Sequence, residues 1–204
     1  MQKFGLVVIG AHSGVRLTSL FEEYQNQNIL LVEPVPYNIA LLKENTAKYK
    51  NISIETSAVS EKNEIKKFYY VKPDAVKKLG KHWASGIGSF EKEHILKHKY
   101  KRFMVNDSHI EQIDIQYLTF SSLIEKYSIF SIDLLQIDVE GAECGILNSI
   151  NFENIEIKKI IFEFKHFDGT FTEGPKLKSI KEKLIKFNYQ LREIDKENIL
   201  AEKN

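Results

Sequence analysis

The chain has 204 residues, of which 43% are hydrophobic and 28% are charged. This length fits one domain, and this composition is typical of a soluble globular protein and too apolar for a disordered one. The 29 basic and 28 acidic residues nearly cancel, and 26 of the basic residues are lysine. Because proteins read bases and phosphates mainly with arginine, we expect no nucleic-acid partner.

The cysteine count and the apolar runs indicate where the protein works. Cys144 is the single cysteine, which excludes a disulfide framework and a zinc cluster of cysteines. A lone cysteine fits a reducing compartment, so we expect a cytoplasmic protein. Residues 4–9 form an apolar run too short for a signal peptide, and no stretch reaches the roughly 18 apolar residues of a membrane span.

The first sixty residues alternate between short β-branched runs and segments with helical spacing of apolar residues. Strands are predicted over residues 6–9, 29–32 and 52–59, and helices over residues 15–24 and 37–49. This alternation predicts a parallel sheet with helices on both faces. For residues 60–71 we expect either an extension of the third strand or a hairpin.

The α/β pattern is interrupted once and then returns. Residues 74–107 lose it, apart from a helix expected over residues 90–99, and a long irregular insert is usually functional. Further strands are predicted over residues 110–115, 132–139 and 157–164, further helices over residues 121–127, 141–150 and 175–187, and a terminal hairpin over residues 189–194 and 198–201. Without a linker or an internal repeat, residues 1–204 are expected to form a single domain.

A glycine-bounded turn follows the first predicted strand. Its sequence is Gly10-Ala11-His12-Ser13-Gly14. Glycines at such a turn let a ligand approach the backbone, and the N–H groups of the next helix face that ligand. The turn matches neither the G-x-G-x-x-G fingerprint nor a P-loop. A helix-capping turn without a ligand is an equally good interpretation of this motif alone.

An acidic residue at the end of the second strand strengthens the ligand interpretation. Glu33 lies 23 residues after Gly10 and precedes Pro34. In doubly wound sheets an acidic residue at about this spacing accepts hydrogen bonds from a ribose. The two features together predict an adenosine-containing ligand, which could be NAD or S-adenosylmethionine.

Acidic residues and a histidine follow two later strands. Asp138 and Glu140 are two residues apart at the end of one strand, and Glu163 and His166 follow the next. Ligands of open α/β sheets bind outside the carboxyl ends of the strands, so we expect these side chains at one rim. They could bind a metal, hold sugar hydroxyls or supply a base. Alternatively, Glu140 only places charge at a helix N-terminus.

Six short motifs occur in a fixed order along the chain. They are Gly-Ala-His-Ser-Gly (10–14), Glu-Pro-Val-Pro-Tyr-Asn (33–38), Leu-Lys-Glu-Asn (42–45), Ala-Val-Ser (58–60), Ile-Asp-Val-Glu-Gly-Ala-Glu (137–143) and Glu-Phe-Lys-His (163–166). In order and spacing they resemble the FkbM-type family of class I S-adenosylmethionine-dependent methyltransferases. Two positions depart from the family pattern, since Val8 stands where Asp is usual and His12 where Asn is usual.

The resemblance implies an α/β fold with a Rossmann-like class I methyltransferase sheet. This sheet is mostly parallel, has an antiparallel C-terminal strand and carries helices on both faces. The resemblance also implies S-adenosylmethionine as cofactor and O-methylation of a sugar or another hydroxyl compound. The implied cofactor contacts come from Gly10, Ala11, His12, Ser13, Gly14, Glu33, Pro34, Ser57, Ala58 and Asp138. The implied catalytic residues are Asp138, Glu140 and His166, with Glu140 or His166 as the base. The cluster of Asp138, Glu140 and Glu163 could bind a divalent cation, but its spacing does not require one.

The insert gives the sequence clue to the acceptor. Residues 74–102 hold eight basic and three acidic residues. One interpretation is a solvated helix face; the other is a lid that attracts an anionic acceptor, such as a phosphorylated sugar or an acidic glycan. The substrate residues expected at this lid are Trp83, Ser85, Ser89 and Glu163.

Two alternatives remain open from the sequence. Val8 and the few residues before the first strand also fit a catalytically degenerate module that binds cofactor or serves as a scaffold. Those few residues further suggest that a second copy of the chain covers the site in a homo-oligomer. The expected partner is in either case a small molecule or glycan.

Overall fold

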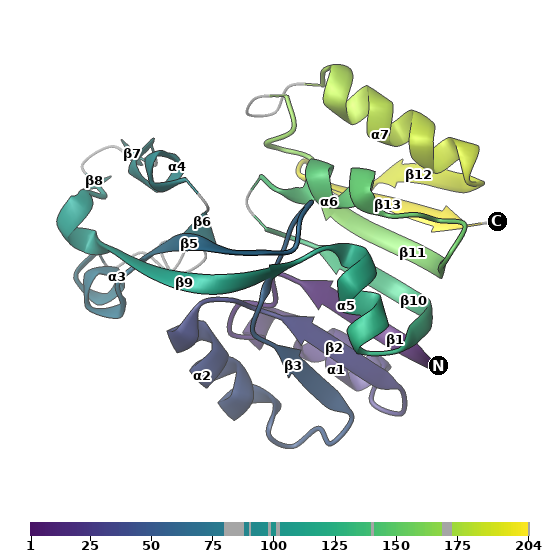
Figure 1. The fold of residues 1–204 in the computed structure, drawn as a ribbon, viewed down its shortest axis with the longest axis horizontal. Helices are drawn as coiled ribbons and strands as arrows, with labels where there is room; N and C mark the ends of the chain where they lie inside the picture. Colours follow the sequence, from purple (N-terminus) through teal and green to yellow (C-terminus); the bar gives the residue numbers. More distant parts are fainter. Residues whose placement is uncertain are drawn as a thin grey trace.

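The structure analysed is a computed structural model that describes residues 1–79, 88–89, 91–97, 99–100, 103–139, 141–168 and 173–203. Within these residues the strands form a seven-stranded sheet, a four-stranded sheet and a two-stranded ribbon. Figure 1 shows the two larger sheets side by side, with the long strands of the smaller sheet reaching away from the larger one.

The seven-stranded sheet has the order β12-β13-β11-β10-β1-β2-β3. Its strands are β1 (Gln2–Ile9), β2 (Asn28–Val32), β3 (Ile52–Glu55), β10 (Ile129–Ile137), β11 (Glu156–Glu163), β12 (Tyr189–Glu193) and β13 (Asn198–Lys203). The five neighbouring strands from β11 to the edge strand β3 are parallel, whereas β13 runs antiparallel to both β11 and β12. The predicted fold class, including the antiparallel C-terminal strand, is therefore confirmed.

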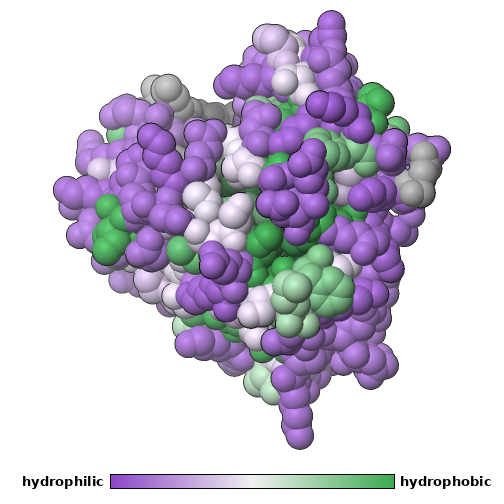
Figure 2. Space-filling view, turned by 45° about the vertical axis from the view of Figure 1, so that its right-hand side comes forward, coloured by the Kyte–Doolittle hydropathy of each residue, from purple (hydrophilic) through white to green (hydrophobic). Residues whose placement is uncertain are grey.

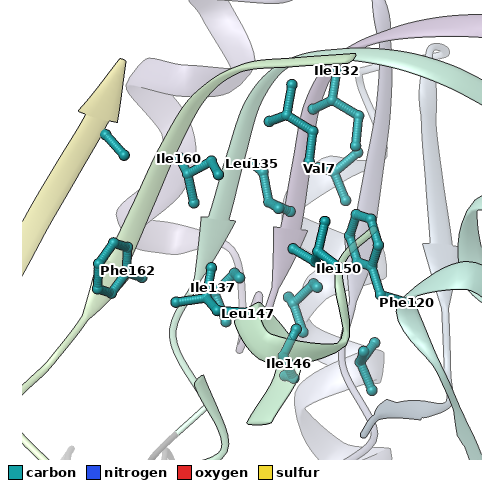
Figure 3. Packing of buried hydrophobic residues seen from close by; sticks show 14 of the residues in the cluster. Val7, Phe120, Ile132, Leu135, Ile137, Ile146, Leu147, Ile150, Ile160 and Phe162 are labelled. Carbon is teal, nitrogen blue, oxygen red and sulfur yellow. The ribbon is translucent and has the colours of Figure 1, made fainter. Parts of the chain in front are cut away.

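Helices cover both faces of this sheet because alternate residues of its buried strands point to opposite sides. On β1, Val7 and Ile9 join one cluster, and Leu6 and Val8 join the other. The first cluster is covered by α5 (Phe120–Lys126), α6 (Glu143–Ser149) and α7 (Pro175–Lys186), and the second by the 3-10 turn η1 (Val15–Leu17), α1 (Thr18–Glu23) and α2 (Pro36–Thr46). Figure 3 shows the first cluster between the strands and α6.

The smaller sheet differs from the sequence-based expectation. Its order is β4-β9-β5-β6, formed by β4 (Ala58–Val59), β5 (Glu64–Val71), β6 (Gly88–Ser89) and β9 (Ile110–Leu118). The predicted strand over residues 52–59 is thus two strands in two sheets. Residues 60–71 form neither an extension nor a local hairpin, because β5 pairs antiparallel with the distant β9.

The insert packs on this smaller sheet and has apolar clusters of its own. Its further elements are α3 (Pro73–Leu79), α4 (Lys92–Lys97), β7 (Lys99–Tyr100), β8 (Phe103–Met104) and the 3-10 turn η3 (Asp107–His109). One cluster joins Val71, Ala75, Ile95, Val105 and Ile110. The helix expected over residues 90–99 is shorter than predicted, since the chain forms β7 after it. The division into a single domain with a lid stays a prediction.

The surface is mostly hydrophilic on the face shown in Figure 2, where apolar residues gather in a central band. No helix among the described residues is long and apolar enough to cross a membrane.

Candidate functional site

A large cavity opens where the chain order of the sheet reverses. β1 lies between β2 and β10, so the loops after β1 and β10 leave the sheet in adjacent positions. Ligands of open α/β sheets bind at such a switch point. The cavity has a volume of about 1030 Å³ and is lined by both of these loops, by the loop after β2 and by residues of the smaller sheet and α4.

The predicted glycine turn forms one wall of this cavity and has unusual backbone angles. Gly10, His12 and Gly14 have φ angles of +92°, +51° and +76°. A Cβ atom at Gly10 would lie 1.8 Å from the carbonyl oxygen of Asp138, so only glycine fits there. Besides glycine, Asn, Asp and His adopt positive φ most readily. The change from the family's Asn to His12 therefore keeps the backbone shape of the turn.

Glu33 ties the loop after β2 to this turn. It is 5% exposed, and its Oε2 accepts a hydrogen bond from the His12 backbone N–H at 2.9 Å. Its Oε1 accepts from the Val35 N–H at 3.0 Å and from Asn38 Nδ2 at 3.2 Å. Burial raises the pKa of Glu33, and these donors oppose the rise by stabilising the charged form. Both Glu33 and Pro34 line the cavity.

Glu55, at the end of β3, shapes the next part of the wall. Its side chain accepts hydrogen bonds from the Ser57 N–H at 3.0 Å and from the Tyr127 hydroxyl at 3.1 Å, and Lys126 lies 2.6 Å away. Burial would raise the pKa of Glu55, but Lys126 and the other donors hold it below its usual value. Ala58 lines the cavity, whereas Ser57 is buried behind it and its Oγ finds no partner among the described residues.

The loop after β10 forms the opposite wall and is held by a buried carboxylate. Glu143 is 1% exposed, and its two oxygens accept hydrogen bonds from the Val139 N–H at 2.8 Å and the Gly141 N–H at 2.9 Å. Burial raises the pKa of Glu143 to about 7, and the charge of Asp138 adds to the rise. Asp138 itself is exposed and lines the cavity.

Three carboxylates meet beside this loop. Oxygen atoms of Asp138, Glu143 and Glu163 lie within 4.8 Å of one another. Carboxylate oxygens are suitable ligands for hard divalent cations. However, both oxygens of Glu143 already accept backbone hydrogen bonds, so this cluster does not require a cation.

A further part of the cavity wall combines the core sheet with the insert. His166, after β11, and His94, on α4, both line it, and their ring centroids are 6.3 Å apart at an interplanar angle of 87°. Ser89 of β6 and the neighbouring Glu91 also line this side. Two imidazoles, a hydroxyl and two carboxylates, including that of Asp138, can hold polar groups of a substrate.

Most of the predicted site residues therefore meet at one cavity. Those that line it are Gly10, Ala11, His12, Ser13, Gly14, Glu33, Pro34, Ala58, Ser89, Asp138 and His166. Glu163 is not part of the lining but belongs to the carboxylate cluster with Asp138 and Glu143. Glu140, Trp83 and Ser85 lie outside the described residues.

Several residues of the site were not anticipated from the sequence. Arg16, Phe68, Glu91, His94 and Gln136 line the cavity. Arg16 follows the glycine turn and Gln136 lies near the end of β10, so both reach the cavity from the core, whereas Phe68, Glu91 and His94 reach it through the packing of the smaller sheet and the insert. Glu143 ends the motif of residues 137–143, and its place in the first turn of α6 is a known sequence signal for capping.

Comparison with protein families decides which kind of site this is. The family model described as the methyltransferase FkbM domain matches residues 9–192. The chain belongs to this family. The resemblance found in the sequence motifs is therefore confirmed, and the cavity is the candidate active site of an FkbM methyltransferase domain. Comparison with curated proteins found no match.

Solved structures with a similar fold are other methyltransferases and fibrillarins. A fibrillarin pre-rRNA processing protein of Methanococcus jannaschii has a TM-score of 0.50 and 12% identity, covering 98% of this chain and 66% of its own. A precorrin-6y C5,15-methyltransferase of Geobacter metallireducens GS-15 has a TM-score of 0.48 and 11% identity, and the match covers 100% of this chain and 82% of that chain. The fibrillarin of Aeropyrum pernix, solved with natively bound S-adenosyl-L-methionine, has a TM-score of 0.46 and 10% identity, and the match covers 97% of this chain and 65% of that chain. At these identities the likeness concerns the fold.

Proposed function

We propose that the chain is an S-adenosylmethionine-dependent O-methyltransferase acting on a hydroxyl group of a sugar, glycan or glycosylated metabolite. The observation that carries this proposal is the two-sided cavity of about 1030 Å³. Pockets for a single small ligand usually measure roughly 300–1,000 Å³, so this cavity has room for a cofactor and an acceptor together. One side is the glycine turn of the family, and the other is formed by the insert.

The residues present fit the cofactor. Glycine at position 10 lets the turn lie directly against the Asp138 carbonyl, where a Cβ atom would clash, and all five residues of the turn line the cavity. In the proposed arrangement the turn of residues 10–14 holds the methionine part, and Glu33 accepts from the ribose. Oε2 of Glu33 accepts from the His12 N–H, and a carboxylate oxygen can accept a second hydrogen bond.

The side chains at the acceptor side support methyl transfer to oxygen. When bound, S-adenosylmethionine would supply an electrophilic methyl group, whose bond electrons stay on sulfur as the acceptor oxygen forms the new C–O bond. Asp138 and His166 would orient the acceptor hydroxyl, and His166 would take its proton, because an imidazole accepts protons near neutral pH. The remaining contribution of the protein is orientation of the two reactants.

The charge of the lining bears on the acceptor. Among the described residues that line the cavity, Arg16 is a cation, Glu33, Glu91 and Asp138 are acidic, and none is a lysine. The lysines of the insert therefore give no support, within the described residues, to an anionic acceptor. A neutral polyhydroxyl acceptor fits this lining better.

Calorimetry and a methyl-transfer screen test the proposal. We expect S-adenosylmethionine to bind with micromolar or better affinity and NAD not to bind. We further expect S-adenosylhomocysteine to form when sugars or glycosides are added as acceptors. Binding of NAD alone, or of neither compound, would contradict the cofactor assignment. Cofactor binding without transfer to any acceptor would favour the degenerate module instead.

A further inference from the structure

The further inference concerns His94, the imidazole that the insert contributes to the cavity. His94 lies on α4, and His166 follows β11 of the core sheet. Their rings meet edge to face with centroids 6.3 Å apart. The insert and the core sheet therefore meet, at the acceptor side of the cavity, through two groups that can each donate and accept hydrogen bonds.

The position of His94 is fixed by the packing of its helix. Its neighbour Ile95 is 0% exposed and joins the apolar cluster with Val71, Ala75 and Ile110. Successive residues of a helix point about 100° apart, so this anchored neighbour directs His94 away from the apolar cluster. The His94 backbone N–H also donates to the carbonyl of Glu91 at 3.0 Å.

The His94 ring also lies near the loop that carries Asp138. Its Cε1 lies 4.0 Å from the point where a Cβ atom on Gly141 would be. Its Nε2 is shielded from solvent, although the residue as a whole is partly exposed. A polar nitrogen in a sheltered part of a cavity is suited to a directed hydrogen bond, since water competes little there.

The lining around the two imidazoles indicates what they would bind. Glu91, Asp138 and Ser89 line the same cavity, and the Ser89 hydroxyl accepts a hydrogen bond from the Glu91 backbone N–H. An imidazole pair with carboxylates repels an anion when the rings are neutral. It matches a hydroxyl group, which donates one hydrogen bond and accepts others.

We propose that His94 is an acceptor-binding residue that, together with His166, holds a hydroxyl group of a neutral polyhydroxyl acceptor at the Asp138 side of the cavity. This inference rests on the proposed O-methyltransferase function. It assigns part of the acceptor site to the insert, so that the acceptor is bound between the smaller sheet and the core sheet.

Two substitutions at position 94 separate hydrogen bonding from ring packing. His94→Phe keeps an aromatic ring against His166 and removes both nitrogens, whereas His94→Gln keeps a group that donates and accepts hydrogen bonds. Glu93→Gln, at an exposed position of the same helix, is the control. Each variant is assayed for methyl transfer to a panel of neutral methyl glycosides over a range of pH, and its binding of S-adenosylhomocysteine is measured by calorimetry.

We expect His94→Phe to lower kcat/KM for the acceptor at least tenfold, mainly through KM, and to leave binding of S-adenosylhomocysteine within twofold. His94→Gln should recover part of the loss, and Glu93→Gln should behave as wild type. Wild-type kcat/KM in His94→Phe, or an equal loss of S-adenosylhomocysteine affinity, would overturn the inference. A wild-type protein that methylates no acceptor would overturn the proposed function, and the role of His94 with it.

Discussion

At the scale of single residues, the backbone of the glycine turn explains which substitutions the family pattern tolerates. His12 has a φ of +51°, and its N–H is held by Glu33 at 2.9 Å. The turn therefore needs a residue that adopts positive φ, while its side chain can differ from the family's Asn. Val8, the other departure, is 0% exposed in the apolar core and is not part of the cavity lining.

Replacing Glu33 tests whether it serves the cofactor. Glu33→Ala removes the acceptor of three hydrogen bonds and frees the His12 N–H. We expect binding of S-adenosylmethionine to weaken by about 1–3 kcal/mol, the usual effect of losing a charged hydrogen-bond partner, as measured by calorimetry. Glu22→Ala is the control, because Glu22 lies at the surface beside Lys48. Equal affinity in wild type and Glu33→Ala would show that Glu33 is not a cofactor ligand.

Glu143 makes stability depend on pH. Burial raises its pKa from 4.5 to about 7, so between these values the folded protein holds a proton that the unfolded chain has lost. The free energy of unfolding should therefore fall as pH rises through this window, by about 3 kcal/mol in all. Denaturation of wild type and Glu143→Gln at pH 5 and pH 8 measures this. We expect the wild type to lose more stability than the variant, and parallel losses would contradict the assignment.

At the scale of elements, the strands of the core sheet and the start of β9 were predictable, whereas the pairing of the smaller sheet was not. Strands β1 and β2 are buried on both faces over nearly their whole length, and β10 and β11 carry short apolar runs in their second halves, and such runs can be recognised locally. By contrast, the first half of β5 is mostly charged and exposed, and β5 is a strand because it pairs with β9, about fifty residues away along the chain. Local patterns carry no information on such pairing.

The candidate site divides in the same way. The glycine turn, Glu33 and Asp138 lie at the ends of the recognisable strands, so their convergence followed from the order of the sheet. His94 reaches the cavity only because α4 packs on the smaller sheet through Ile95. The part of the cavity wall formed by the glycine turn, Glu33 and Asp138 could therefore be predicted from the sequence, and the insert's contribution required the tertiary structure.

A lysine joins two helices of the core. Lys183 of α7 donates hydrogen bonds to the carbonyls of Leu147, Asn148 and Ile150, at the C-terminal end of α6, at 2.9, 2.7 and 2.9 Å. These carbonyls have no partners within their own helix, and a cation there also suits the helix dipole. Burial lowers the pKa of Lys183, which shows that its ammonium group is partly removed from water.

Removing this ammonium group should destabilise the fold. Lys183→Met keeps the apolar stem and leaves three carbonyls without their donor, so we expect a loss of about 1–3 kcal/mol in the free energy of unfolding, measured with urea. Lys178→Met, at an exposed position of the same helix, should change stability by about 0.5 kcal/mol or less. Equal effects of the two substitutions would show that the contacts of Lys183 add nothing to stability.

At the scale of the whole molecule, the chain has two packing units that meet at the cavity. The core sheet is stabilised by the two large clusters on its faces, whereas the insert depends on the small cluster around Ile95. Stability is not uniform across a protein, and regions with few buried apolar contacts open at lower cost. The acceptor side of the cavity, which α4 and β6 form, should therefore open more readily than the cofactor side.

Hydrogen exchange of two core variants tests this difference. Ile95 and Ile160 are both 0% exposed, the first in the insert cluster and the second in the core cluster. Truncating either to alanine removes apolar contacts worth about 2–5 kcal/mol. Ile95→Ala should speed amide exchange in α4, β5 and β9 while β1 and β10 keep their protection, whereas Ile160→Ala should speed exchange throughout. If Ile95→Ala reduced protection in β1 and β10 as strongly as in α4, the two sheets would unfold as one cooperative unit, and the acceptor side could not open separately.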